Sequence, residues 1–490
     1  MVSAKSQNSK LAKGIFWSVV EFLIKRVLDL VVRLTLAIVL LPSDFGIVGM
    51  ATVFISFIQV LNDAGIYAAL IQRKDEDLTD AHYHTTFWTQ MVWSILLYFF
   101  CVIVLAPLVA QFYHEPILVK IMPFLCITFI TSSLNTIHKS QLLKQLEFKK
   151  IAFISNVSSL IAGGVALALA FLNFGVWAIV VYNTLAYIIT IPLYFTATKW
   201  MPKFIWKKEE FKDVFSFGMY TTGTQVINNV AGNVDYLIIG KFFSATLLGI
   251  YTLAFMLTNM IKSQVTSVID RVIFPFYSSI QNDREKITKY YLTLIKYYST
   301  SIFLMMLILI IFGSDIIKLG FGVKWTETII PMKILSVSVM IDTLTSGYNL
   351  LYRSIGQPRK EMNLKLIIFS FLYVPSVIVG IYLNGIIGAA EGILFSKFMS
   401  FILIQFFLKK DFNITQKDLF HQSKPALFAS LVILFLFYPL AYFFSGGIIL
   451  TGLLIILCCA VYLYVCSFFF KNEISMIRVK LKSRRNKINE

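Results

Sequence analysis

The stretch "GIFWSVVEFLIKRVLDLVVRLTLAIVLLP", residues 14–42, has the length and the apolar flanks of a membrane-crossing helix, yet it contains five charged residues. An apolar stretch of about 20 residues spans the hydrocarbon core of a bilayer. An ionisable side chain near the bilayer centre costs at least about 2.5–3.5 kcal/mol, so such groups rarely face lipid and usually mark a functional site. The sequence therefore predicts a first spanning helix with one face turned away from lipid. The charged residues are Glu21, Lys25, Arg26, Asp29 and Arg33.

All five charges fall on one face when the stretch is plotted at about 100° per residue. The spacing of four residues from Glu21 to Lys25, and from Asp29 to Arg33, allows ion pairs along the helix. Three cations and two carboxylates leave one excess positive charge, and we interpret this face as a wall of a water-filled lumen. The alternative is an amphipathic helix that lies on the membrane surface. The run Leu34–Leu40 favours the spanning helix, because it extends the apolar segment to a spanning length.

The composition of the chain indicates a polytopic, all-α membrane protein. Of its 490 residues, 58% are hydrophobic and 14% are charged, whereas soluble proteins contain about 25% charged residues. The mean hydropathy is +0.76. The net charge of +18 is spread over short loops and not clustered on one face, which argues against a nucleic-acid partner. The cysteines lie in apolar runs without a metal-ligand spacing, and we interpret them as small buried residues.

Apolar stretches of spanning length predict about fourteen transmembrane helices, of which the segments 211–239 and 243–270 are the least hydrophobic. Cytoplasmic loops are enriched in Lys and Arg. Of the 44 Lys and Arg residues, 33 fall in the set of loops that includes both termini, and five fall in the opposite set. The sequence therefore predicts a multi-pass protein with both termini in the cytoplasm.

Two segments of the chain, residues 14–198 and 218–409, read as copies of one unit. The segment "LNFGVWA" (Leu172–Ala178) resembles "LNGIIGA" (Leu383–Ala389), and "DFGIVGMA" from Asp44 resembles "LLGIYTLA" from Leu247. An even number of spans in each copy predicts a parallel repeat with a pseudo-two-fold axis along the membrane normal. The predicted organisation is a cytoplasmic N-terminus (1–14), two six-helix bundles (15–198 and 211–409), two additional helices (425–470) and a basic cytoplasmic tail (471–490).

The second copy supplies further polar residues inside its predicted spans. The segment "QVINNVAGNVDYL", residues 225–237, contains Asp235 near its end. Lys262 lies inside the next predicted span. We expect Lys262 to line the same lumen as Lys25. For Arg271 and Lys296, a lumen position and an anchoring position at the cytoplasmic interface stay open. Four deeper single charges are candidates for the lumen or for structural ion pairs: Asp63, Asp342, Glu391 and Lys397.

Catalytic motifs do not emerge from the sequence. The five histidines lie in loops or at span edges, without a Ser, Cys or Asp arrangement around them. A GxxxxGK[ST] phosphate-binding loop is missing from the sequence, and the predicted external loops are too short for a catalytic domain. We therefore expect a protein that is not an enzyme and that has no cofactor.

Several motifs resemble those of the Wzx-type polysaccharide flippases of the multidrug/oligosaccharidyl-lipid/polysaccharide exporter superfamily. They lie between about residues 10 and 410 and include "KGIFWS" (13–18), "LPSDFGIVGMATVF" (41–54), "DAGIYAALIQRKD" (63–75), "FGVWAIV" (174–180) and "LIIGKFFSATLLGIY" (237–251). The resemblance implies fourteen helices, arranged as two six-helix bundles plus two. It also implies a location in the bacterial inner membrane.

For function, the resemblance implies a flippase that moves undecaprenyl-diphosphate-linked oligosaccharide repeat units, such as those of O-antigen lipopolysaccharide, to the periplasmic leaflet by alternating access. The expected partners are this glycan lipid, membrane lipids, and a polysaccharide polymerase with its chain-length proteins. A cationic lumen can replace the hydration of a diphosphate. The expected phosphate-binding cations are Lys25, Arg26, Arg33, Lys262, Arg271 and Lys296. Glu21, Asp29, Asp63 and Asp235 are their expected charge partners, or carriers of a coupling proton or sodium ion.

Two alternatives to this function stay open. One is a lipid II-type or other lipid or drug exporter of the same superfamily. The other is a scaffold of a polysaccharide-assembly complex that transports nothing. Neutralising the charges of the lumen separates transport from the scaffold, because a scaffold does not need them.

Overall fold

The computed structural model confirms the predicted all-α fold class, and no strand occurs among the residues that it describes. These are residues 24–25, 27–63, 65–66, 70, 78–260, 262–263, 265–266, 273, 277, 280, 283–443 and 447–470. The chain divides into two compact units, residues 1–252 and 253–490, and each is described by itself. The domain boundaries expected from the sequence stay a prediction.

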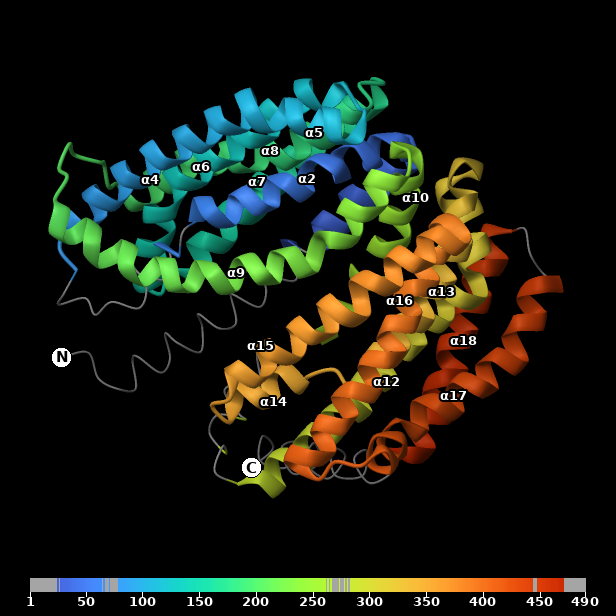
Figure 1. Ribbon diagram of the computed structural model, residues 1–490. Coiled ribbons are helices and arrows are strands. Elements are labelled where there is room, and N and C mark those ends of the chain that lie inside the picture. Colours follow the sequence, from blue (N-terminus) through green and yellow to red (C-terminus); the bar gives the residue numbers. More distant parts are fainter. Residues whose placement is uncertain are drawn as a thin grey trace, which may run out of the picture. The chain divides into compact units, whose positions relative to one another are not determined.

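The first unit is a bundle of long antiparallel helices (Figure 1). A helical segment at residues 27–39 precedes the others. These are α2 (Pro42–Asp63), α4 (Asp80–Phe100), α5 (Ala106–Tyr113), α6 (Ile117–Lys144), α7 (Phe148–Phe171), α8 (Val176–Thr198), α9 (Lys208–Phe242) and α10 (Ala245–Phe255). A π-helical turn at Cys101–Leu105 joins α4 to α5, so the two cross as one span. Helix α6 packs between α4 and α8, α7 packs on α8, and α9 runs along α2.

The second unit is built around α12 (Arg284–Asp315) and α13 (Ile329–Thr343). Its other helices are α14 (Tyr348–Ser354), α15 (Pro358–Ile367), α16 (Val374–Phe412), α17 (Gln416–Phe443) and α18 (Ile448–Phe469). Helix α13 packs on α16, and α12 packs on α13, α17 and α18. One hydrophobic core joins these helices, with fully buried Tyr291, Phe312 and Tyr462 among its largest members. Helices α17 and α18, which correspond to the two additional helices predicted at 425–470, are thus packed into the same core as α12.

The two turns that the sequence matches as repeats have the same backbone conformation. Between α7 and α8, Gly175 has φ 56° and ψ −129°. Within α16, Gly385 has φ 57° and ψ −135°, and it breaks the long helix into two antiparallel arms. A positive φ is available to glycine without the clash that a Cβ would cause. This agreement supports the predicted internal repeat at these positions.

Ten helical stretches in the described part of the chain are long and apolar enough to cross a membrane. One of them, Pro358–Phe412, contains two predicted spans, because α16 turns back at Asn384 and Gly385. Three predicted spans are not among the ten. Helix α9 corresponds to the predicted span 211–239 and is long but polar, the span at 243–270 is described as continuous helix only to Met260, and the span at 15–41 lies partly outside the described residues.

Candidate functional site: a polar cavity in the first unit

Three helices of the first unit carry polar residues at matching helical spacings. On α2 they are Thr52, Ser56, Gln59 and Asp63; on α6 they are Thr128, Ser132, Asn135 and Lys139; on α8 they are Asn183, Tyr187, Thr190 and Tyr194. Each set has the spacing i, i+4, i+7, i+11, which places its members on one face of a helix. The three faces converge, together with residues of α7, around a cavity of about 540 Å³.

A hydrogen-bond network fixes the wall of this cavity between α2 and α6. Gln59 Nε2 donates to Asp63 Oδ1 at 3.1 Å and to Ser132 Oγ at 3.3 Å. Asn62, which is fully buried behind this wall, donates to Ser132 Oγ at 3.1 Å and accepts from Ser94 Oγ at 2.7 Å. These bonds satisfy polar groups that would otherwise be costly inside a helix bundle. The network therefore holds Asp63 and Ser132 in place.

The side-chain amide of Asn135 has hydrogen-bond partners in the protein for only part of its polar atoms, unlike the amide of Asn62. Its Nδ2 donates to Thr190 Oγ1 at 2.8 Å. Its Oδ1 is buried and has no hydrogen-bond donor among the described residues. A buried acceptor without a partner costs about 1–3 kcal/mol. Asn135 Oδ1 is therefore an unsatisfied acceptor in a residue that lines the cavity.

Charged groups at the cavity are two lysines and one carboxylate: Lys25, Lys139 and Asp63. The sequence predicted Lys25 and Asp63 as site residues, and the structure brings them to one cavity. The sequence does not predict Lys139 as a site residue, because the apolar stretch ends before it and Lys139 reads as part of a cytoplasmic loop, whereas α6 continues to Lys144. The polar residues of α6 and α8 are also cavity residues beyond the predicted set, and their helical spacing is the signal in the sequence that indicates them.

Two other charges of the first helix, Asp29 and Arg33, form an ion pair. Arg33 Nε lies 3.2 Å from Asp29 Oδ2, which confirms the predicted pairing of these two residues. Tyr182 on α8 donates from its hydroxyl to Asp29 Oδ1 at 2.6 Å, and the Arg33 guanidinium lies 5.7 Å from the centre of its ring. Asp29 and Arg33 thus attach the first helix to α8. Glu21 and Arg26 lie outside the described residues.

The remaining predicted residues are distributed over both units. Asp235 on α9 is buried and accepts from the Tyr251 hydroxyl at 2.8 Å. Lys296 on α12 lies 4.0 Å from the centre of the Phe470 ring, a cation–π contact that suits an anchoring position. Arg271 lies outside the described residues.

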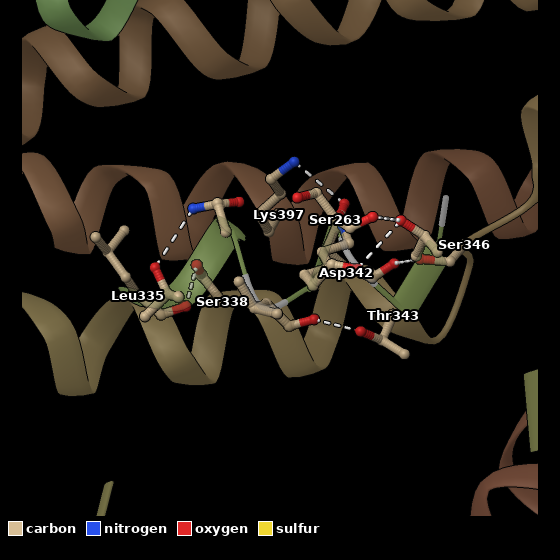
Figure 2. A network of polar contacts seen from close by, with 12 residues as sticks. Ser263, Leu335, Ser338, Asp342, Thr343, Ser346 and Lys397 are labelled. Atoms are coloured by element: carbon tan, nitrogen blue, oxygen red, sulfur yellow. Dashed lines mark hydrogen bonds and ion pairs between the residues drawn. The ribbon is translucent and has the colours of Figure 1, made fainter. Parts of the chain in front are cut away.

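In the second unit, Lys262 is part of a cluster with Asp342 on α13 and Lys397 on α16. Lys262 Nζ contacts Asp342 Oδ2, and Lys397 Nζ lies 3.1 Å from Asp342 Oδ1. Figure 2 shows Asp342 reaching toward Lys397, beside Ser346, whose hydroxyl donates to the Asp342 carbonyl at 3.1 Å. The cluster carries one excess positive charge and is partly exposed. Among the deeper single charges, Asp342 and Lys397 are therefore members of an ion-pair cluster, while Glu391 lies 3.3 Å from Asn384 Nδ2.

Comparison with known proteins assigns this chain to a family. Residues 35–330 match the model of a family described as polysaccharide biosynthesis protein. The teichuronic acid biosynthesis protein TuaB of Bacillus subtilis is 28% identical over 57% of this chain, and the match spans 58% of TuaB. The lipopolysaccharide biosynthesis protein WzxC of Escherichia coli is 25% identical over 83% of this chain and 82% of its own length.

Two solved structures share the fold. The lipid II flippase MurJ in an inward closed conformation has a TM-score of 0.70 at 17% identity, covering 94% of this chain and all of MurJ. An inward-facing multidrug transporter of the MATE family has a TM-score of 0.63 at 14% identity, covering 81% of this chain and 98% of its own. These similarities confirm the polytopic, all-α fold of the chain.

Proposed function

Because the chain belongs to the polysaccharide biosynthesis protein family, we propose that it is a flippase for polyprenyl-diphosphate-linked oligosaccharide repeat units. In this proposal it moves the repeat unit from the cytoplasmic to the periplasmic leaflet of the bacterial inner membrane by alternating access. The undecaprenyl carrier and a lipopolysaccharide type of glycan are the chemistry implied by the resemblance to Wzx-type flippases. A polymerase and chain-length proteins act on the product in this proposal.

The single observation that carries the proposal is the polar cavity at α2, α6, α7 and α8. A diphosphate-linked sugar cannot cross hydrocarbon without replacement of its hydration. Lys25 and Lys139 supply cations for the diphosphate, and hydrogen bonds to charged groups are stronger than those between neutral ones. Asn135, Asn183 and Tyr187 supply the amide and hydroxyl groups that pair with sugar hydroxyls. The cavity therefore offers partners for both parts of the head group.

The experiment is a flipping assay in proteoliposomes with a lipid-linked oligosaccharide. Loss of one charge-assisted contact costs about 1.5–3 kcal/mol, or roughly ten- to over a hundredfold in binding. We expect Lys25→Ala and Lys139→Ala to reduce flipping by this amount, and Lys25→Arg to retain part of it because the charge survives. Lys120→Ala on α6, an exposed lysine that does not line the cavity, is the matched control.

Two outcomes discriminate between the candidate functions. If Lys25→Ala and Lys139→Ala flip as well as Lys120→Ala, the cationic cavity does not carry the substrate and a scaffold role gains support. If the protein moves lipid II or a cationic drug in preference to the oligosaccharide lipid, the lipid II-type or drug-exporter alternative replaces this proposal. Asp63 is the carboxylate that we propose for proton or sodium coupling, and Asp63→Asn should then remove the dependence of flipping on an ion gradient.

A further inference from the structure

The connection between α8 and α9, residues 199–207, is fastened along α4, and we name it the strap. Its backbone is bonded at Lys203, whose N–H donates to His84 Nδ1 at 3.1 Å and whose carbonyl accepts from Trp88 Nε1 at 2.8 Å. Lys207 N–H donates to Thr85 Oγ1 at 3.1 Å. The strap thus runs along one face of α4.

A second cavity, of about 690 Å³, lies between the strap, α4 and the start of α9. We name it the aromatic groove; its wall includes Trp88, Val92, Trp93, Leu96, Phe204 and Trp206. Its volume lies in the range of about 300–1,000 Å³ that is typical of ligand sites. Unlike the polar cavity, its lining is mostly apolar.

The indole groups of the aromatic groove have their polar atoms satisfied by the protein. Trp93 Nε1 donates to the Leu61 carbonyl at 3.0 Å, and Trp206 Nε1 donates to Thr89 Oγ1 at 3.0 Å. Trp88 donates to the strap and stacks on Phe204, with ring centres 4.4 Å apart. The ring faces are therefore the surface that a ligand meets, and they suit a long apolar chain.

The groove continues into a surface that faces lipid. Val92 and Leu96 in its wall, and Phe99 and Ile103 beyond it, are each more than half exposed. They recur at i, i+4, i+7 and i+11 and form one apolar stripe along the span. A ligand can therefore enter the groove from the hydrocarbon of the bilayer without crossing water.

Positive charge and polar surface adjoin the groove. The strap and the first turns of α9, which supply part of the groove wall, carry exposed lysines on the side predicted to be cytoplasmic; they are Lys199, Lys203, Lys207, Lys208 and Lys212. Gln90, in the groove wall, donates from Nε2 to Thr136 Oγ1 at 3.4 Å, and Thr136 lines the polar cavity. One side-chain contact thus separates the apolar groove from the polar cavity. This combination matches an amphiphile with a long apolar chain and an anionic head.

We propose that the aromatic groove holds the isoprenoid chain of the lipid-linked glycan. The inference rests on the proposed function, because that function supplies an isoprenoid ligand. The groove would hold the chain while the head group occupies the neighbouring polar cavity.

A polyprenyl phosphate without sugar, carrying a diazirine near the end of its chain, tests the proposal with the full-length protein in nanodiscs. After illumination, mass spectrometry should locate the crosslinks at residues 88–96 and 204–206. Val92→Trp fills the groove and should reduce crosslinking at least about tenfold, equivalent to about 1.4 kcal/mol. Ile103→Trp, on the same stripe but outside the groove, is the matched control and should crosslink like the original protein.

Competition decides between an isoprenoid site and a general lipid site. Unlabelled polyprenyl phosphate should abolish the crosslinks, whereas phosphatidylglycerol at the same concentration should leave them. Crosslinks elsewhere, or equal competition by phosphatidylglycerol, would overturn the proposal. The competition experiment uses the unsubstituted protein, so it tests the proposal even if Val92→Trp fails to fold. Leu96→Trp is a second variant that fills the groove.

The flipping assay separates this inference from the proposed function. If the groove binds the sugar-free probe but the protein flips no oligosaccharide lipid, the isoprenoid site stands and the flippase function fails. If flipping is intact but the groove does not crosslink, the flippase function stands and the isoprenoid site is wrong.

Discussion

Gly46 on α2 and Gly249 on α10 make reciprocal contacts with each other's helices. A Cβ on Gly46 would overlap the carbonyl oxygen of Ala245, and a Cβ on Gly249 would overlap the carbonyl oxygen of Pro42. The offset from Gly46 to Gly249 equals the offset from Pro42 to Ala245. The same offset separates the matching segments that begin at Asp44 and Leu247. A contact in which i meets j and j meets i is the mark of a two-fold relationship. The predicted repeat thus reappears as a symmetric close approach of two helices.

This close approach predicts sensitivity to a single methyl group. Gly46→Ala and Gly249→Ala force two backbones apart, and overpacking of this kind costs about 1–3 kcal/mol. Both variants should melt at lower temperature in detergent, as measured by fluorescence-detected size exclusion. Gly164→Ala on α7 is the control, because a Cβ there meets nothing within 4 Å. Equal melting temperatures for Gly46→Ala and Gly164→Ala would show that the approach is not tight.

We expect a substitution of Asn135 to weaken binding of the oligosaccharide lipid without changing binding of the sugar-free lipid. Asn135→Leu removes the unpaired Oδ1, and the loss of one neutral hydrogen bond costs about 0.5–1.5 kcal/mol, or roughly two- to tenfold in binding. We expect weaker binding of the oligosaccharide lipid and unchanged binding of the sugar-free polyprenyl diphosphate, measured by microscale thermophoresis. Thr190→Val removes the bond that Asn135 Nδ2 makes within the protein and serves as the control. An equal loss for both ligands would assign Asn135 to packing.

The cluster in the second unit predicts that the loss of stability in Asp342→Ala is partly rescued by a second substitution at Lys262. Lys262→Ala leaves Asp342 with one fewer of the cations that contact it, and Asp342→Ala strands Lys262 and Lys397. Losing a partner of a partly buried charge costs about 1–3 kcal/mol, so each single variant should lower the melting temperature. The double variant Lys262→Ala/Asp342→Ala strands one cation, Lys397, where Asp342→Ala strands two, so it should recover part of the stability that Asp342→Ala loses.

Transport by the same double variant assigns the role of Lys262. If Lys262 binds the diphosphate, as the sequence predicts, flipping stays lost in the double variant even though the protein is stable. If flipping returns together with stability, Lys262 is a structural counter-ion of Asp342 and the predicted phosphate contact is wrong.

Arg33 is a predicted phosphate-binding cation that the structure places in an ion pair. Because Tyr182 and Arg33 both contact Asp29, Tyr182→Phe should destabilise the protein by about 0.5–1.5 kcal/mol without changing ligand affinity. Arg33→Gln combined with Asp29→Asn removes both charges and should keep the affinity for polyprenyl diphosphate. A loss of affinity in this double variant, with the melting temperature retained, would return Arg33 to the substrate site.

Hydropathy and periodicity were enough to predict most of the membrane helices and one local contact. The fold class follows from composition and hydropathy, and the Asp29–Arg33 pair follows from a spacing of four residues within one helix. The turns at Gly175 and Gly385 lie in two short segments whose sequences resemble each other. These features depend on neighbouring residues along the chain, and for that reason one sequence reveals them.

Contacts between distant segments could not be predicted in the same way. Asp342 meets Lys262 and Lys397, which are 80 and 55 residues away, because α13 happens to pack beside α16. The pairing of such charges depends on which helices are neighbours and on their rotation. Lys139 shows a second reason: a helix that continues past the expected membrane boundary carries its charge into a cavity that hydropathy does not detect.

The strap has a mechanical consequence for the chain that follows it. Lys203 and Lys207 are bonded to α4, and α9 begins immediately afterwards at Lys208. No flexible linker therefore separates the bonded residues of the strap from α9. A displacement of the start of α9 is transmitted directly to α4. A tilt of α9 would strain the hydrogen bonds that His84, Thr85 and Trp88 of α4 make with the strap. We therefore expect α4 and α9 to move together.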